Sequence, residues 1–219
     1  MNPEQTTADY DRQAHAHHWR PEALFGLVYE YLQPGDRLLD IGIGTGLASQ
    51  TFARAGVQVF GFDVDREMLQ VCRDKSFAAD LKVYDLLDAP WPYQAASFEH
   101  ALACGVLHFL ADLEPIFAEV SRIVRPGGTF TFTTKAPPSS LAEVGADEEP
   151  AEETIQGTRL FLHPQGYLDR IMAASGFEPL KQLRLMVTTG RGTDDLFRAY
   201  VTRRLPSAAT GDLPEARTP

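Results

Sequence analysis

The sequence predicts an α/β fold in which helices cover both faces of a mostly parallel sheet. Five short apolar runs typical of strands alternate with helical patterns in the first two thirds of the chain. The first run, residues 38–41, is followed by Gly42, Gly44 and Gly46 and then by an apolar helical pattern. A strand, a glycine turn and a helix begin a βαβ unit, whose crossover is right-handed. The C-terminal ends of the five strands therefore meet at one sheet edge, where open α/β sheets bind ligands.

Hydrophobic periodicity and turn residues define the remaining elements. An apolar helical pattern after Pro21 predicts a helical cap over residues 1–33, and the turn at residues 33–36 leads into the first strand. The connection around Gly190 is too short for a crossover, so we expect the last two strands to pair antiparallel. The expected strands are residues 38–41, 57–63, 81–84, 98–104, 129–134, 177–188 and 196–203, and the expected helices are one that ends at Gly56, one around Met68, 110–124 and 163–174.

Length and composition indicate one domain. The chain has 219 residues, of which 44% are hydrophobic, and no break in composition separates two cores. We therefore expect a single domain over residues 1–205 and a disordered tail over residues 206–219, which are rich in Pro, Ala and Thr. Acidic residues crowd the segment 143–153, which we expect to be a solvated, mobile loop.

Charge and residue usage exclude several classes of protein. The formal net charge is -10 and no cluster of Lys and Arg is evident, which argues against nucleic-acid binding. No apolar run approaches the ~20 residues that span a bilayer, and the N-terminus does not resemble a signal peptide. We therefore expect a cytoplasmic protein that does not bind membranes. Two cysteines are too few for a disulfide framework, and His15, His17 and His18 lack further ligands, so we expect no metal site.

Acidic residues at the strand ends indicate what the sheet edge binds. Four expected strands end at Asp40, Asp63, Asp85 and Cys104, whose side chains would converge on one crevice. Asp63 lies about twenty residues beyond the glycine turn, from where a carboxylate can accept hydrogen bonds from two ribose hydroxyls. Asp85 can accept a hydrogen bond from an adenine amino group, while the backbone NH of Leu86 can donate to a ring nitrogen. The sequence therefore predicts a site for an adenine nucleoside.

The glycine spacing leaves the class of nucleoside ligand open. An NAD(P)-dependent oxidoreductase would use the same sheet edge, and Asp63 alone fits that class too. Such an enzyme is expected to show GxGxxG and a proton-relay group such as TyrxxxLys, whereas this loop reads GxGxG and no such relay is evident. The oxidoreductase is therefore the less favoured alternative.

Four stretches together resemble motifs of the class I S-adenosylmethionine-dependent methyltransferases, of the small-molecule type with a methyltransferase type 11 or type 25 domain. They read LLDIGIGTGLAS, VFGFDVDREML, KVYDLLDAPWPYQAASFEHALACGVLHFL and RIVRPGG, and the resemblance covers about residues 33–205. It implies a Rossmann-like seven-stranded sheet in the order 3214576 with strand seven antiparallel. It also implies an enzyme (EC 2.1.1.-) that uses S-adenosylmethionine as cofactor and methylates a small molecule.

The resemblance further implies a role for each residue at the crevice. The loop from Gly42 through Gly44 to Gly46, with Asp40, would hold the methionine part of the cofactor. Asp63 would bind the ribose, and Asp85 with Leu86 the adenine. The other implied contacts are Val64, Met68 against the adenine face, Cys104 and Gly105 on the sulfonium side, and Tyr10 and Trp19 as a lid from the N-terminal segment.

Methyl transfer from a sulfonium is an in-line displacement, so the protein mainly aligns the acceptor and excludes water. A general base helps only when the acceptor is a hydroxyl or a protonated amine, and His108, just after the fourth strand, is the candidate. The alternative is that His108 packs beside the cofactor or begins the next helix. A noncatalytic S-adenosylmethionine-binding regulator also remains open, because fold does not fix function. The acceptor and the oligomeric state cannot be predicted from these residues.

Overall fold

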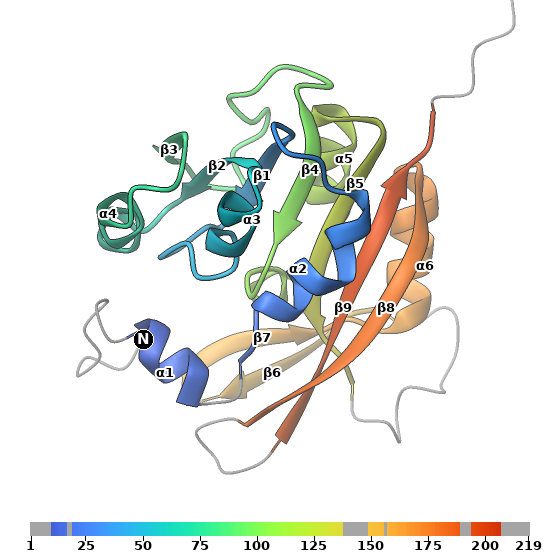
Figure 1. The fold of residues 1–219 in the computed structure, drawn as a ribbon. Coiled ribbons are helices and arrows are strands. Elements are labelled where there is room, and N and C mark those ends of the chain that lie inside the picture. Colours follow the sequence, from blue (N-terminus) through green and yellow to red (C-terminus); the bar gives the residue numbers. More distant parts are fainter. Residues whose placement is uncertain (1–9, 17–18, 138–148, 156, 189–193, 207–219) are drawn as a thin grey trace, which may run out of the picture.

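A twisted sheet organises the chain, and its strand order confirms the predicted one (Figure 1). The computed structural model describes residues 10–16, 19–137, 149–155, 157–188 and 194–206. The strands that match the sequence prediction are β1 (Arg37–Ile41), β2 (Gln58–Asp63), β3 (Asp80–Val83), β4 (Phe98–Ala103), β5 (Val124–Lys135), β8 (Phe177–Thr188) and β9 (Asp194–Arg204). Strands β3, β2, β1, β4 and β5 lie side by side in that order and are parallel. Strand β9 then pairs antiparallel with β5, and β8 pairs antiparallel with β9, as the short connection between them required.

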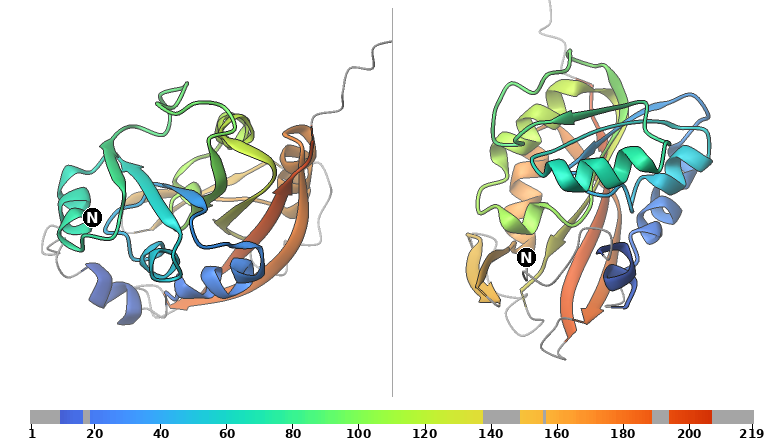
Figure 2. Two further views of the ribbon diagram at one scale, coloured as in Figure 1. Left: turned by 45° about the horizontal axis from the view of Figure 1, so that its top comes forward. Right: turned by 90° about the vertical axis from the view of Figure 1, so that its left-hand side faces the viewer.

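Helices cover both faces of the sheet (Figure 2). On one face, Phe117 and Ile171 from two helices share a core cluster with Phe130 of β5. On the other face, Val28 and Phe52 share a second cluster with buried residues of β1 and β4. No helix among the described residues is long and apolar enough to cross a membrane. The helices are α1 (Tyr10–Ala16), α2 (Glu22–Val28), η2 (Tyr29–Tyr31), α3 (Gln50–Arg54), α4 (Arg66–Asp74), η3 (Leu107–Phe109), α5 (Glu114–Ile123) and α6 (Gln165–Ala174).

A β-hairpin replaces part of the predicted mobile loop. Strands β6 (Ala151–Ile155) and β7 (Thr158–Leu162) pair antiparallel, with the left-handed Gly157 in the turn between them. The hairpin joins the sheet through a single register pair between Lys135 at the end of β5 and Leu162. The prediction of a loop is therefore wrong for residues 151–153, whereas residues 143–148 and the tail residues 207–219 lie outside the described residues. Exposed acidic side chains on an edge strand produced a composition that resembled a loop.

Two element boundaries also differ from the prediction. The helix after the glycine turn begins only at Gln50, because residues 47–49 form turns. The predicted helix 110–124 begins only at Glu114, as α5, and η3 lies before it at residues 107–109; β5 follows α5 directly at Val124. The register of the pairing between β4 and β5 shifts between Phe98 and His100. The two backbones approach closely at this shift: a Cβ on Gly128 would lie 2.3 Å from the carbonyl oxygen of Glu99. Glycine is required there by this close approach of two backbones.

An ion pair on α5 fixes the connection between β3 and β4. Arg122 donates to both oxygens of Glu119, at 2.8 and 2.6 Å, and to the carbonyl oxygens of Trp91 and Tyr93. The same Glu119 carboxylate accepts a hydrogen bond from the backbone N of Trp91 at 2.7 Å. The Trp91 ring in turn donates to the carbonyl oxygen of Leu86, so the chain just beyond β3 is held from both sides.

We expect Arg122→Met to destabilise the fold by about 2 kcal/mol, because it leaves a largely buried carboxylate and two loop carbonyls without their donor. Urea unfolding measures this change. Arg125→Met is the matched control, since Arg125 is 54% exposed and lies 3.6 Å from Glu99, so its loss should change the unfolding free energy by about 0.5 kcal/mol or less. Equal losses for the two variants would contradict the assignment.

Candidate functional site

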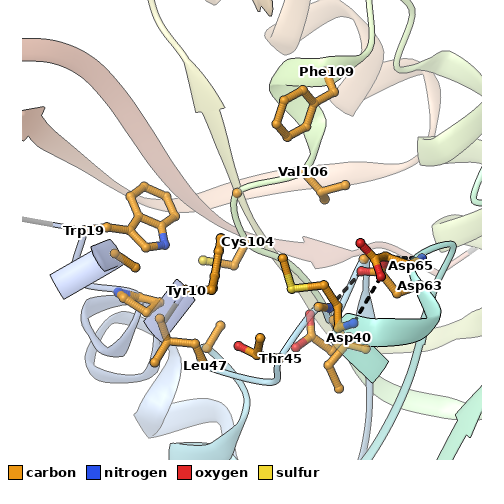
Figure 3. Close-up of a pocket in the computed structure, with 18 of the residues that line it drawn as sticks. Tyr10, Trp19, Asp40, Thr45, Leu47, Asp63, Asp65, Cys104, Val106 and Phe109 are labelled. Carbon is orange, nitrogen blue, oxygen red and sulfur yellow. Dashed lines mark hydrogen bonds between the residues drawn. The ribbon is translucent and has the colours of Figure 1, made fainter. Parts of the chain in front are cut away.

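A pocket of about 620 Å³ opens at the sheet edge where β1, β2 and β4 end (Figure 3). Its size is typical of small-molecule sites. Among the described residues no group of His, Cys, Asp and Glu side chains could hold a metal ion. The predicted site residues that line the pocket are Tyr10, Trp19, Asp40, Gly42, Gly44, Asp63, Val64, Met68, Cys104, Gly105 and His108, whereas Gly46, Asp85 and Leu86 do not line it.

The glycine loop has left-handed backbone conformations at each of its glycines. The φ angles are +66°, +52° and +79° for Gly42, Gly44 and Gly46. Two of these glycines are also required by packing: a Cβ on Gly42 would lie 2.8 Å from the Val106 side chain, and one on Gly46 would lie 2.5 Å from the Phe77 ring. Gly46 therefore faces the protein interior, which explains why it does not line the pocket.

Gly44 faces open space and is tied to the end of β2. A Cβ built there would meet only Asp63 Oδ2, at 3.9 Å. Asp63 Oδ2 accepts a hydrogen bond from Gly44 N at 2.8 Å, and Oδ1 accepts one from Asp65 N at 2.9 Å. Burial raises the pKa of Asp63, while these two hydrogen bonds act to lower it. Because a carboxylate has about four lone-pair positions, Asp63 retains acceptor capacity toward the pocket.

Asp40 at the end of β1 is the second carboxyl group of this site. The residue is 2% exposed, and its Oδ2 has no hydrogen-bond partner among the described residues. Burial, with a smaller contribution from the nearby charge of Asp63, raises the pKa of Asp40 to about 7. A buried acceptor without a partner is unfavourable, so a ligand that carries a hydrogen-bond donor would be stabilised here.

The chain that leaves β4 forms the centre of the pocket. Gly105 has a φ of +75°, and its N donates to Thr133 Oγ1 at 2.8 Å. A Cβ on Gly105 would lie 3.2 Å from the Trp19 ring, so the N-terminal segment packs directly onto this turn. Burial raises the pKa of Cys104 well above its usual value. Cys104 is therefore a neutral thiol that packs against the pocket rather than a nucleophile.

Helix α1 lies beside the glycine loop and is joined to it by polar contacts. Thr45 Oγ1 donates to Asp11 Oδ1 at 2.5 Å, and Lys75 Nζ donates to Asp11 Oδ2 at 2.5 Å. Lys75 also donates to the carbonyl oxygen of Thr45 at 2.8 Å. Tyr10, which precedes Asp11, lines the pocket, and burial raises its pKa to about 12. The helix that carries Tyr10 is thus connected to both the glycine loop and the end of α4.

The residues predicted to bind adenine lie just beyond the pocket. Strand β3 ends at Val83, so Asp85 and Leu86 belong to the following turn. Asp85 is exposed, and its Oδ1 accepts a hydrogen bond from Leu87 N at 2.9 Å. Leu86 is held through its carbonyl oxygen by the Trp91 ring. Their adenine-binding roles stay predictions.

His108 lines the pocket as a buried, neutral imidazole. It is 9% exposed, and its Nδ1 has no hydrogen-bond partner among the described residues. Burial lowers the pKa of His108 to about 3, with a smaller contribution from the charge of Lys135. Its ring packs on Phe109 and Phe197, with centroids 4.3 and 5.3 Å away. No carboxylate contacts the ring in the described part of the chain, which agrees with packing beside the pocket.

The sequence prediction missed several lining residues that come from distant segments. Val187 and Phe197 lie on β8 and β9, and Phe109 lies on η3. The expected topology could have indicated Phe197. A strand antiparallel to β5 begins at the edge where β5 ends, so the first residues of β9 reach the site. Thr45, between two predicted glycines, was also missed because its hydroxyl contacts α1 rather than a ligand.

Known proteins resemble this chain in sequence. Residues 39–132 match the family model of a methyltransferase domain. The chain is 31% identical over 153 residues to 27-O-demethylrifamycin SV methyltransferase of Amycolatopsis mediterranei. The aligned region covers 68% of this chain and 56% of that protein. It is 34% identical over 124 residues to malonyl-[acyl-carrier protein] O-methyltransferase of Serratia marcescens, covering 57% and 47%. The chain spans about half the length of the curated relatives it matches.

Solved structures resemble it in fold. A crystal structure of an S-adenosylmethionine-dependent methyltransferase from Methanosarcina mazei aligns with a TM-score of 0.68 and 20% identity, covering 83% of this chain and 98% of that chain. At this identity the likeness concerns the fold alone. The strand order, the glycine loop and the sequence matches agree with one another. The chain therefore belongs to the class I methyltransferases, whose typical methyl donor is S-adenosylmethionine.

Proposed function

We propose that this chain transfers a methyl group from S-adenosylmethionine to a small-molecule acceptor. The observation that carries the proposal is the contact between Gly44 and Asp63, which holds an open glycine loop against a carboxylate with spare acceptor capacity. Two vicinal ribose hydroxyls match that capacity. The net charge of -10 favours a small acceptor over a nucleic acid, whose phosphates would be repelled.

The other residues fit the remaining parts of the cofactor. The unpartnered Oδ2 of Asp40 suits the α-amino group of the methionine moiety. Gly44 leaves room for that moiety to lie directly against the backbone. Met68 lines the pocket, and Val64 does so while 66% exposed, which provides apolar surface for a base. Each of these assignments is part of the proposal.

A sulfonium donor supplies a methyl group that is already activated, so the protein's own residues have to orient the acceptor and exclude water. Trp19 packs on Gly105 and Tyr10 lines the pocket beside it, which suits closure by the N-terminal segment. His108 would accept a proton only from an acceptor hydroxyl or amine, and its low pKa makes it a weak base. We therefore assign His108 a hydrogen-bonding role toward the acceptor.

Binding and turnover assays separate this function from its alternatives. Calorimetry should detect binding of S-adenosylmethionine and S-adenosylhomocysteine but not of NAD. Transfer of label from methyl-labelled cofactor to a metabolite panel then separates an enzyme from a noncatalytic regulator. Binding of NAD in preference to S-adenosylhomocysteine would overturn the proposal.

We expect Asp63→Ala to weaken S-adenosylhomocysteine binding by about 10- to 150-fold, because loss of one hydrogen bond to a charged group costs about 1.5–3 kcal/mol. The variant also frees Gly44 N, so its fold is checked by circular dichroism. Asp80→Ala is the control, since Asp80 begins β3 at the opposite sheet edge. Unchanged affinity in a folded Asp63→Ala protein would refute the ribose assignment.

The affinity for S-adenosylhomocysteine should depend on pH through Asp40. With its pKa raised to about 7, Asp40 is increasingly protonated as the pH falls below 7, and binding of an ammonium group selects the carboxylate. We therefore expect calorimetric affinity to rise by up to about tenfold per pH unit between pH 5 and 7 and to level off above pH 7. In Asp40→Asn this component should be absent and the affinity lower. A wild-type affinity that is flat over this range would exclude the role.

Closure by α1 should depend on Asp11. We expect Asp11→Ala to weaken S-adenosylhomocysteine binding by about tenfold, or about 1.4 kcal/mol, because it breaks the contacts with both Thr45 and Lys75. In this variant, S-adenosylhomocysteine should no longer slow the hydrogen exchange of the backbone amides of residues 10–16. Asp74→Ala is the control, because Asp74 lies on the same α4 end as Lys75 but its side chain contacts only Gln70 among the hydrogen bonds described. Equal behaviour of the two variants would argue against closure.

A further inference from the structure

The lining of the pocket is divided into a polar half and an aromatic half. The polar half contains Asp40, Asp63 and the glycine loop, which the proposed function assigns to the cofactor. The other half contains the rings of Trp19 and Phe109, which lie on the side away from the carboxylates (Figure 3). Since Cys104 and Val106 are drawn between the two groups (Figure 3), the aromatic half is where an acceptor would approach the methyl group.

The aromatic half is a connected set of rings. Trp19 and Phe197 meet edge to face with centroids 5.6 Å apart, and Phe197 meets His108 edge to face at 5.3 Å. His108 is in turn 4.3 Å from Phe109. Edge-to-face contacts at these distances are favourable and accommodate further rings in the same way. Phe109 is nevertheless 47% exposed, so a ligand would bury apolar surface that the protein leaves uncovered.

The buried lysine whose charge acts on His108 is already neutralised. Lys135, at the end of β5, is 2% exposed and forms ion pairs with Glu153 of the hairpin and with Asp195, to which it donates at 2.6 Å. Asp195 is two residues before Phe197 on β9. Lys135 therefore has its charge compensated by two carboxylates and is not a free partner for an acidic ligand. None of these three residues lines the pocket.

An acidic acceptor would be unfavourable in such surroundings. Bringing a carboxylate against aromatic rings without a counter-ion removes its hydration and replaces it with nothing equivalent. His108 supplies a polar contact among the rings, and as a neutral imidazole it can exchange a hydrogen bond with a hydroxyl or an amine. This half thus offers stacking surface and neutral polar groups, which come from Trp19, Phe109, Phe197 and His108.

We propose that Trp19, Phe109 and Phe197 form the acceptor subsite and that it takes an uncharged aromatic ring bearing a hydroxyl or amine, which His108 orients. The inference rests on the proposed function, because it presumes that the cofactor occupies the polar half. It adds the substrate class: a neutral aromatic compound rather than an acidic metabolite.

Two naphthalene probes of matched shape test the charge requirement: 1-naphthol and 1-naphthoate. Their fluorescence is titrated at pH 7 with the full chain saturated with S-adenosylhomocysteine. We expect saturable binding of 1-naphthol and at least tenfold weaker binding of 1-naphthoate. Equal or tighter binding of 1-naphthoate, or no saturable binding of 1-naphthol, would overturn the proposal.

Variants locate the probe in the pocket. Phe197→Ala should weaken 1-naphthol at least fivefold while leaving S-adenosylhomocysteine affinity within twofold, and Phe197→Leu, which better preserves the packing, should weaken it less. Met186→Ala is the control, because Met186 is 55% exposed and outside the pocket lining, although it neighbours the lining residue Val187. Equal effects of Phe197→Ala and Met186→Ala would overturn the subsite. Failure of S-adenosylhomocysteine to bind at all would instead refute the proposed function.

Discussion

The hydrogen bond from Gly44 N to Asp63 Oδ2 is the contact on which the geometry of the site depends. It joins the turn after β1 to the end of β2, two strands that are already paired in register along their length. A second backbone contact, from Ile43 N to the carbonyl oxygen of Phe62, supports the same junction. Because Asp63 and Phe62 belong to β2, their two hydrogen bonds with Gly44 N and Ile43 N hold the loop in place before any ligand arrives. The position of the glycine loop is therefore set by the fold and not by a bound ligand.

Packing around the loop restricts which residues its positions can hold. Ile43 lies across β2 at Gly61, where an added Cβ would be 2.5 Å from the Ile43 side chain. Gly42 and Gly46 have close neighbours as well as positive φ angles, whereas Gly44 has open space. Two of the three glycines are thus required by the protein itself, and only one faces the ligand space. A glycine pattern read as a ligand signature is mainly a packing pattern in this structure.

The sequence predicted the parts of the molecule that are local along the chain. The strands up to β5 and the positions of Asp40 and Asp63 near strand ends follow from apolar runs and turn residues, which are local features of the sequence. The order of the strands in the sheet was implied only by the resemblance to a known family. The β6–β7 hairpin was missed because its stability comes partly from a distant ion pair between Lys135 and Glu153. Phe197 was missed for a similar reason: nothing in its own neighbourhood shows that β9 returns to the edge where β5 ends. Contacts between distant segments carry no local signature.

The two halves of the pocket differ in the same way: one is built from segments that are close in the sequence, and the other from segments that are distant. The polar half is built mainly from β1, β2 and the turns that follow them, so it forms wherever that unit folds. The aromatic half combines Trp19, Phe109 and Phe197, whose relative positions depend on the N-terminal segment, the β4 connection and the final hairpin. Substitutions in those segments can reshape the aromatic half without moving the Asp63–Gly44 contact. The architecture therefore allows the aromatic half to change while the geometry of the polar half is retained.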